Sequence, residues 1–419
     1  MEQREIQGKY ATAIAYASVM EDEAVEQIRR MCDHDCAAGA TIRIMPDVHW
    51  GKGCTIGTTM TITDKVVPNL VGVDIGCGMY TVNLGKGTLD LPKVDEAAHV
   101  IPSGRDLWPG RQEKFDFTAL RCYRELKDAK RLGKSLGTLG GGNHFIEIDR
   151  GADGTNYLVI HSGSYYFNGN FTVLQSLAID LSHGKGELFA ARDALIRQYK
   201  EEGRRAEIQA AVTELYRAFR AKATDIPADL AFLSGVYMEN YLHDVALCQA
   251  FAKRNREIMA EVLLDRLGLK AVDAFHTVHN YIDIEEKILR KGAIAAHRGE
   301  RLLIPLNMRD GSIFAVGRGD PDWNYSAPHG AGRLMSRSAA RQKFTLAEFQ
   351  REMQGVYTTA VNESTIDEAP MAYKSMHDII DTMRGAVDVI EIWQPIYNFK
   401  AGEAKPAESE KEKAQEDVD

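Results

Sequence analysis

Short apolar runs separated by glycine turns dominate about the first 150 residues of the chain. Runs of β-branched and other apolar residues bounded by Gly, Asn and Asp are typical of strands. The pattern predicts strands at residues 41–45, 55–63, 69–75 and 79–84. A further apolar run, residues 157–160, predicts a strand that ends at His161.

The pattern becomes helical between about residues 171 and 267. Ala, Arg, Glu and Leu recur at helical spacing in residues 188–222 and 237–267, which predicts helices there. Strand patterns return at residues 294–306 and 312–316. A short helix is predicted after Gly332, and residues 371–400 have a mixed pattern.

The chain shows neither an internal repeat nor an interdomain linker. We therefore expect an α+β fold in one large domain, residues 1–402, with mixed β-sheets and a helical insertion at about 171–267. Residues 403–419 are rich in Glu, Lys and Ala and lack aromatic residues. Such a segment buries too little apolar surface to fold, so we expect a disordered acidic tail.

Composition narrows the class of protein. The chain is 44% hydrophobic and 26% charged, which is typical of a globular protein. No run of about 18 apolar residues is present, so we expect no membrane-spanning segment. The six cysteines are too irregular for a disulfide framework, and the N-terminus lacks an apolar signal core, so we expect a cytoplasmic protein.

The formal net charge is −9, which at first argues against a nucleic-acid-binding protein. The segment 401–419 contains three Lys and seven Asp or Glu and so carries −4 of that charge. Because binding depends on local patches, the remaining −5 excludes little.

Chemistry-bearing residues gather in six short segments. Five combine His, Cys or Asp with Gly or lead into a Gly turn, and the sixth pairs two histidines. They are residues 45–49 (MPDVH), 72–79 (GVDIGCGM), 139–147 (LGGGNHFIE), 161–164 (HSGS), 329–333 (HGAGR) and 276–280 (HTVHN).

Asp74 and Cys77 are predicted to lie where an apolar strand breaks into glycine turns. A carboxylate and a thiolate, joined by imidazoles from elsewhere, suit a divalent transition metal. Taken alone, these two residues are better explained by structural roles than by metal binding: Cys77 as a small buried apolar residue and Asp74 as a turn former. The same combination recurs at His144 and His161, which favours a metal site.

Two segments are predicted to bind phosphate. Asn143 and His144 follow three glycines, whose N–H groups can cradle an anion, although a flexible turn would share this composition. A helix predicted directly after His329 would place its imidazole beside a helix N-terminus, which favours phosphate.

Basic residues form two groups. Arg333, Arg337 and Arg341 recur every four residues and predict a basic stripe on one helix, either a track for a phosphate backbone or a solvated face. We expect a second basic group at the solvated surface, comprising Lys287, Arg290, Lys291, Arg298 and Arg301.

In this order, the segments closely resemble the RtcB family of RNA ligases. The match runs from Met45 to Lys400 and rests on the motifs MPDVHWGKG, GVDIGCGM, LGTLGGGNHFIE, HSGS, HN at residues 279–280, HGAGRLMSR and DEAPMAYK. The resemblance implies an α+β fold with a deep cleft that holds two Mn(II) ions.

Residue by residue, the resemblance implies that Asp74, Cys77 and His144 bind one Mn(II). Cys77, His161 and His279 would bind the other, so that Cys77 bridges the ions. His329 matches the family's nucleophile, which becomes guanylylated by GTP. The GTP-binding residues implied by the match are Asn143, Glu147, Asn280, Tyr373 and Lys400.

The implied activity is a GTP-dependent joining of an RNA 3′-phosphate or 2′,3′-cyclic phosphate to a 5′-hydroxyl. The resemblance places this activity in RNA repair or tRNA splicing, with tRNA or damaged RNA as substrate and an archease-like or release-factor-like helper protein. The alternatives are a metal-dependent phosphoesterase that opens cyclic phosphates, and a non-ligating RNA-binding paralogue.

Three departures from the family pattern indicate a divergent paralogue. Tyr165 replaces an arginine of the usual HSGSRG motif, and residues 306–309 read LNMR where the family has GSMG. Residues 324–328 read NYSAP, where the family has a segment rich in Cys and Ser before HGAGR. We expect terminal-phosphate preference to differ as a result. Arg309 or Arg298 could take the place of the missing arginine.

Overall fold

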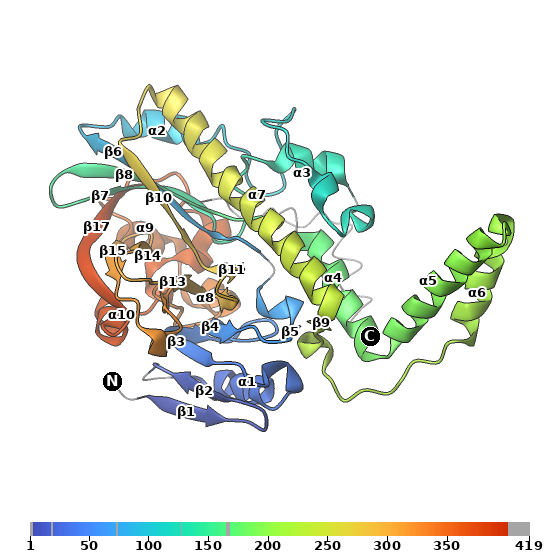
Figure 1. The fold of residues 1–419 in the computed structure, drawn as a ribbon. Helices are drawn as coiled ribbons and strands as arrows, with labels where there is room; N and C mark the ends of the chain where they lie inside the picture. Colours follow the sequence, from blue (N-terminus) through green and yellow to red (C-terminus); the bar gives the residue numbers. More distant parts are fainter. Residues whose placement is uncertain (1–2, 18–19, 73, 127, 165–167, 401–419) are drawn as a thin grey trace.

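The computed structural model describes residues 3–17, 20–72, 74–126, 128–164 and 168–400, except for the side chains of 168–171. The predicted tail, residues 403–419, and Tyr165 lie outside the described residues. Helices and β-sheets form one α+β domain, as predicted (Figure 1). Of the two large sheets, one is mixed, as expected, and the other is antiparallel throughout. Within the described ranges, no helix has the length and apolar character needed to cross a membrane.

A seven-stranded sheet, antiparallel throughout, forms one half of the core. Its strands, in spatial order, are β10 (Asp273–Val278), β6 (Gly78–Lys86), β8 (Thr155–Ser162), β7 (Phe145–Arg150), β17 (Val387–Lys400), β15 (Gly311–Gly317) and β14 (Arg301–Asn307). The run at residues 157–160 predicted β8, an interior strand, and its residues Leu158, Val159 and Ile160 are buried on both faces of the sheet. A strand covered on both sides reads as a continuous apolar run, which explains the sequence pattern.

A six-stranded mixed sheet forms the other half, with β2 and β3 parallel and the remaining neighbours antiparallel. Its strands, in spatial order, are β1 (Arg4–Gln7), β2 (Thr12–Ala15), β3 (Ile42–His49), β4 (Ile56–Thr61), β12 (Ile288–Lys291) and β11 (Asn280–Asp283). Two short pairs complete the described strands, β13 (Ala293–Ala295) with β16 (Ser326–Pro328) and β5 (Lys65–Val66) with β9 (Leu233–Ser234).

The chain passes from one large sheet to the other at His279. Strand β10, at the edge of the seven-stranded sheet, ends at Val278, and β11, at the edge of the six-stranded sheet, begins at Asn280. His279 is therefore the junction residue, and its backbone N–H donates to Cys77 O at 2.9 Å. The two sheets are thus joined at a predicted metal ligand.

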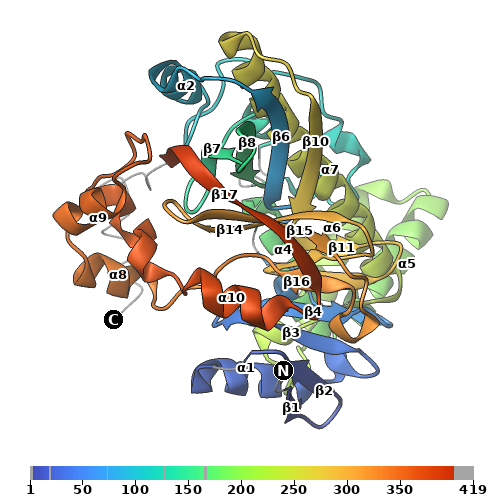
Figure 2. The ribbon, with the colours of Figure 1, turned by 90° about the vertical axis from the view of Figure 1, so that its left-hand side faces the viewer.

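Ten α-helices are described in the ranges given above. They are α1 (Asp22–Cys32), α2 (Leu91–Ala98), α3 (Ala129–Ser135), α4 (Asn168–Ser182), α5 (Lys185–Glu201), α6 (Ile208–Ala218), α7 (Gly235–Leu267), α8 (Arg337–Lys343), α9 (Leu346–Glu352) and α10 (Met376–Met383). The long helix α7 packs along the seven-stranded sheet beside β6 and β8 (Figures 1 and 2).

Two helices stand apart from this core. The predicted helical segment 188–222 is two helices, α5 and α6, which project from the body as a hairpin (Figure 1). Leu188 is the one buried residue of α5, and α6 has none. The residues that flank the hairpin lie side by side, because Lys222 N donates to His183 O at 2.9 Å.

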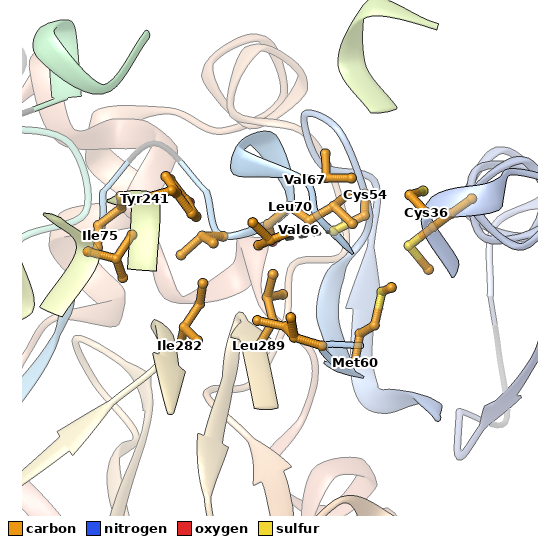
Figure 3. Close-up of a cluster of buried hydrophobic side chains, with 14 of the residues drawn as sticks. Cys36, Cys54, Met60, Val66, Val67, Leu70, Ile75, Tyr241, Ile282 and Leu289 are labelled. Carbon is orange, nitrogen blue, oxygen red and sulfur yellow. Dashed lines mark hydrogen bonds between the residues drawn. The ribbon is translucent and has the colours of Figure 1, made fainter. Parts of the chain in front are cut away.

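A large hydrophobic cluster packs the six-stranded sheet against α1 and α7. Figure 3 shows part of it, where Leu70 and Ile75 lie near Tyr241 of α7 and Leu289 of β12. A second cluster joins the seven-stranded sheet to α7 through Leu158, Ile160 and Met259, among others. Helix α7 thus contacts both halves of the core.

Two predicted elements are wrong. The described residues of the segment 69–75 do not form a strand: Pro68–Leu70 is a 3₁₀ helix, and Asp74 and Cys77 lie in the turn that leads into β6. Pro68 lacks a backbone N–H and its ring fixes φ, which suits the start of a helical turn better than a strand. Leu70, Val71 and Ile75 are buried in the core without belonging to a sheet.

The second error concerns the helix after Gly332. Helix α8 begins at Arg337, where the Ser336 side chain accepts a hydrogen bond from Ala339 N at 3.2 Å. Gly332 has a φ of +73°, a left-handed conformation that a helix does not continue through. His329 therefore does not lie beside a helix N-terminus, and Arg333 is not on the helix that carries Arg337 and Arg341.

Candidate metal centre and active site

A cavity of about 300 Å³ opens where the two sheets meet. Its lining includes five side chains predicted as metal or nucleophile residues and five predicted to bind GTP. The first group is Asp74, Cys77, His161, His279 and His329, and the second is Asn143, Glu147, Asn280, Tyr373 and Lys400. Segments far apart in sequence thus converge on one site of a size suited to a small ligand.

Two sets of metal-ligating side chains share Cys77. Asp74, Cys77 and His144 offer ligand atoms within 4.8 Å of one another, and so do Cys77, His161 and His279. Cys77 Sγ lies 3.4 Å from His144 Nε2 and 3.3 Å from His161 Nε2. These are the two ligand sets that the resemblance implies.

The hydrogen bonds of the histidines decide which nitrogen can bind a cation. His144 Nδ1 donates to Leu139 O at 2.8 Å, and His161 Nδ1 donates to Asn143 O at 3.1 Å. In a neutral imidazole that donates through Nδ1, Nε2 carries the lone pair. Backbone carbonyls that fix the ring in this way are typical partners of metal-binding histidines.

The Nε2 atoms therefore face other electron-pair donors. His144 Nε2 lies 2.9 Å from Asp74 Oδ2, and both histidine Nε2 atoms face Cys77 Sγ. Carboxylate, thiolate and imidazole lone pairs directed at one another require a proton or a cation between them. The donor set, one hard oxygen with soft sulfur and imidazole nitrogens, fits a divalent transition metal.

Burial sets the protonation of this cluster. It is the main cause that lowers the pKa of His161 and of His279 well below the ordinary value, so both rings are neutral near pH 7. Burial, together with the charge of Asp74, also raises the pKa of the Cys77 thiol. A bound divalent cation reverses that last effect, because it stabilises the thiolate.

His329 lies next to His279, with 5.0 Å between the centroids of the two rings. Its Nδ1 donates to Asp47 Oδ2 at 2.7 Å, and its backbone N–H donates to the same oxygen at 3.1 Å. Asp47 is fully buried near the end of β3. This carboxylate fixes the ring so that Nε2 keeps its lone pair, the requirement for a nucleophilic imidazole.

Asp47 was not predicted as a functional residue. Its segment was singled out because Asp and His precede a glycine turn, but no partner could be named. His329 is distant in sequence, and only the packing of β3 beside β16 brings the two together. His49, two residues further along β3, also lines the cavity.

The far end of the cavity holds a buried network around Glu368. Tyr373 OH donates to Glu368 Oε2 at 2.7 Å, and Lys400 Nζ pairs with the same carboxylate. Burial tends to raise the pKa of Glu368, but the charges of Lys400 and Arg337 outweigh it and lower the pKa to about 2. Glu368 is therefore a fixed negative charge, which sequence reasoning did not single out.

Glu147 lies beside this network with different electrostatics. Burial, and then the charge of Asp149, raise its pKa well above the ordinary range. Asn398 Nδ2 donates to Glu147 Oε2 at 2.5 Å. The cavity thus combines an ionised carboxylate with one that gains a proton readily.

The three predicted RNA-binding arginines do not form a free stripe. Their guanidinium groups face the buried carboxylates of Asp367 and Glu368, at distances of 3.0–3.4 Å. Arg333 Nη1 also donates to Tyr373 OH at 3.2 Å. Arg337 and Arg341 still expose more than a third of their side chains, 37% and 38%.

The two arginines offered as substitutes for the family arginine do not line the cavity. Arg309 is paired with Asp310 at 2.7 Å and with Glu352. Arg298 is exposed in the turn between β13 and β14.

Comparisons of the sequence with known proteins identify the family. The sequence model of the RtcB family, described as tRNA-splicing ligase RtcB, matches residues 27–116 and 117–401. The chain is 30% identical over 393 residues to RNA-splicing ligase RtcB of Escherichia coli (strain K12), which covers 83% of this chain and 87% of that protein. It is 29% identical over 422 residues to tRNA-splicing ligase RtcB of Aeropyrum pernix, which covers 80% and 82%.

A more distant relative is RNA-splicing ligase RtcB2 of another Escherichia coli strain (ATCC 25922), 25% identical over 388 residues. The fold, the candidate metal centre and these similarities together define an RNA ligase. The chain belongs to the RtcB family of tRNA-splicing ligases.

Proposed function

We propose that this RNA ligase is GTP- and Mn(II)-dependent and that His329 receives the guanylyl group. Its substrates would be RNA ends with a 3′-phosphate or 2′,3′-cyclic phosphate and a 5′-hydroxyl. The observation that carries the proposal is the paired ligand sets that share Cys77, beside an imidazole that Asp47 orients. Two Mn(II) ions bound there would screen the negative charge of the phosphates.

The first step would be attack by His329 Nε2 on the α-phosphorus of GTP. A nitrogen–phosphorus bond forms, the bond to the bridging oxygen breaks, and pyrophosphate leaves. The ring becomes positively charged as it gives up its lone pair. Asp47, which accepts from Nδ1–H at 2.7 Å, would stabilise that charge without taking the proton.

The GMP would then pass from His329 to an RNA 3′-phosphate, and the 5′-hydroxyl of the second RNA would attack the activated end and release GMP. The protein groups would mainly position and screen phosphates, as expected for phosphoryl transfer. We propose Asn143 for the GTP phosphates and Glu147, Tyr373 and Lys400 for the guanine. Asn280, which lines the same cavity, would complete the nucleotide site.

RNA phosphates would contact the exposed faces of Arg337 and Arg341, while Arg333 holds Tyr373 and Glu368 in place. The physiological substrate would be tRNA or damaged RNA in the cytoplasm. An archease-like or release-factor-like protein would assist turnover.

Incubation with α-labelled GTP and Mn(II) tests the proposal. We expect an acid-labile, alkali-stable covalent adduct that is lost in His329→Ala and kept in His377→Ala, a control histidine exposed on α10. A wild-type protein without an adduct would refute the guanylyl-transfer mechanism. Opening of a 2′,3′-cyclic phosphate by that same protein would favour the phosphoesterase function instead.

A further inference from the structure

Arg256 of α7 is a buried cation with an unusual environment. Its side chain has no exposed surface. One nitrogen, Nη1, donates to two backbone carbonyls, Gly76 O at 2.7 Å and Ser162 O at 2.6 Å. Within the described residues, Nε and Nη2 have no hydrogen-bond partner.

The two carbonyls belong to the segments that carry metal ligands. Gly76 directly precedes Cys77, and Ser162 directly follows His161. Strands β6 and β8 pair up to Gly78 and Ser162, so Cys77 lies just beyond the last pair. Arg256 therefore bridges the two segments where the strand ladder stops holding them together.

The approach of α7 to this turn is as close as glycine allows. A Cβ atom on Gly76, whose φ is +76°, would lie 2.7 Å from Ala252 Cβ and 3.2 Å from Gln249 Cα. The neighbouring Asn255 donates to Ser162 Oγ at 3.2 Å and to Gly163 O at 3.3 Å. One face of α7 thus backs the turn of Cys77 and the end of the strand that carries His161.

A stabilising role alone does not explain a buried guanidinium. Burying a charge is costly unless hydrogen bonds and opposite charge compensate for it, and within the described residues Nε and Nη2 have no hydrogen-bond partner. No carboxylate hydrogen-bonds to Arg256 in the described part of the chain; its hydrogen bonds go to the two carbonyls beside the ligands.

We propose that Arg256 is a positioning residue for the metal centre. It sets the separation of Cys77 and His161, whose Sγ and Nε2 atoms lie 3.3 Å apart, and so controls the ligand set that includes His279. This inference rests on the proposed metal-dependent function. Residues that orient ligands in this way typically change metal affinity 10- to 100-fold when replaced.

The experiment compares Arg256→Met, Arg256→Lys and a control, Arg254→Met, in the full-length protein. Arg254 lies on the same helix but pairs with Glu113 and Glu261 at the surface. Mn(II) binding is measured by calorimetry. Co(II) is then substituted, because thiolate-to-Co(II) absorption reports the bond to Cys77. Thermal unfolding of the metal-free proteins is recorded in parallel.

We expect Arg256→Met to bind Mn(II) about 10- to 100-fold more weakly and to alter the Co(II) absorption. Its metal-free form should stay folded, with an unfolding temperature lowered by roughly a few degrees, because Gly76 O and Ser162 O lose this donor. Arg256→Lys should recover much of the affinity, because one ammonium can donate to both carbonyls. Arg254→Met should bind metal like the wild type.

Two results would overturn the inference in distinguishable ways. If wild-type protein shows no Co(II) absorption that Cys77→Ser abolishes, the metal site itself fails and the inference fails with it. If the wild type shows that band and Arg256→Met binds Mn(II) with unchanged affinity and spectrum, only the role of Arg256 is refuted. Equal loss of stability and affinity in Arg256→Met and Arg256→Lys would also refute it, in favour of a purely structural role.

Discussion

Replacing Asp47 by Asn tests how Asp47 would prepare His329, the proposed nucleophile. Asp47 Oδ2 accepts hydrogen bonds from Nδ1 and from the backbone N–H of His329, while Oδ1 has no partner among the described residues. The amide of Asn has the same shape but can present an oxygen on one side only. With the oxygen toward His329, a buried NH₂ group is left without an acceptor.

With the NH₂ group toward His329, the imidazole must accept at Nδ1 and carry its proton on Nε2, which cannot attack. Both arrangements weaken the nucleophile. A hydrogen bond to a charged group contributes about 1.5–3 kcal/mol and one between neutral groups about 1 kcal/mol. The loss of about 1–2 kcal/mol predicts guanylylation slowed roughly 5- to 30-fold.

The assay is single-turnover formation of the guanylyl adduct from α-labelled GTP, at saturating GTP and Mn(II). Asp95→Asn is the matched control, because Asp95 is also buried but accepts from Thr359 Oγ1 and Tyr397 OH away from the cavity. Asp47→Ala, which leaves Nδ1 without any acceptor, should be slower than Asp47→Asn. If both Asp47 variants formed the adduct at the wild-type rate, the role assigned to this carboxylate would be refuted.

Two further predictions concern stability. The folded-state pKa of Glu368 is about 2, below its ordinary value of 4.5, so its charge stabilises the fold above about pH 4.5 and that stability is lost as pH falls toward 2. Glu368→Gln should therefore be less stable than wild type at pH 7, because Lys400 keeps a buried charge without its partner. The difference in unfolding free energy between the two proteins should shrink in acid. A difference that does not depend on pH would contradict this. Replacing residues 184–221 by two glycines should leave the unfolding temperature and the Mn(II) affinity nearly unchanged. The reason is that His183 O and Lys222 N already meet at 2.9 Å and the hairpin of α5 and α6 has only one buried residue. Loss of folding would contradict this prediction.

The residues of the candidate site were predictable because chemistry and glycine turns coincide in short segments. Cys77, His161 and His279 each lie where a strand begins, ends or changes sheet, which the apolar runs beside them indicate. The α+β fold followed from the change from strand patterns to helical spacing. These signals are local, so a single sequence carries them.

Errors arose where a pattern depended on distant packing. Arg290 and Lys291 were expected at the surface but are buried, because β12 lies inside the six-stranded sheet and Tyr281 OH accepts from Arg290 at 2.8 Å. The regular spacing of Arg333, Arg337 and Arg341 suggested one helix. Their partners, Asp367 and Glu368, lie in a segment that no periodicity connects to them.

The position of His279 at the junction of the two sheets also bears on how the chain folds. Three proposed ligands, Cys77, His144 and His161, lie at the ends of β6, β7 and β8, whereas His279 takes its place only when β10, far along the chain, has paired with β6. Contacts between residues so far apart in sequence form slowly. A cation that needs all of these ligands binds the assembled state alone and shifts the equilibrium toward it. Metal binding would then mark the pairing of β10 with β6, and a chain in which this pairing has not formed would be left without metal.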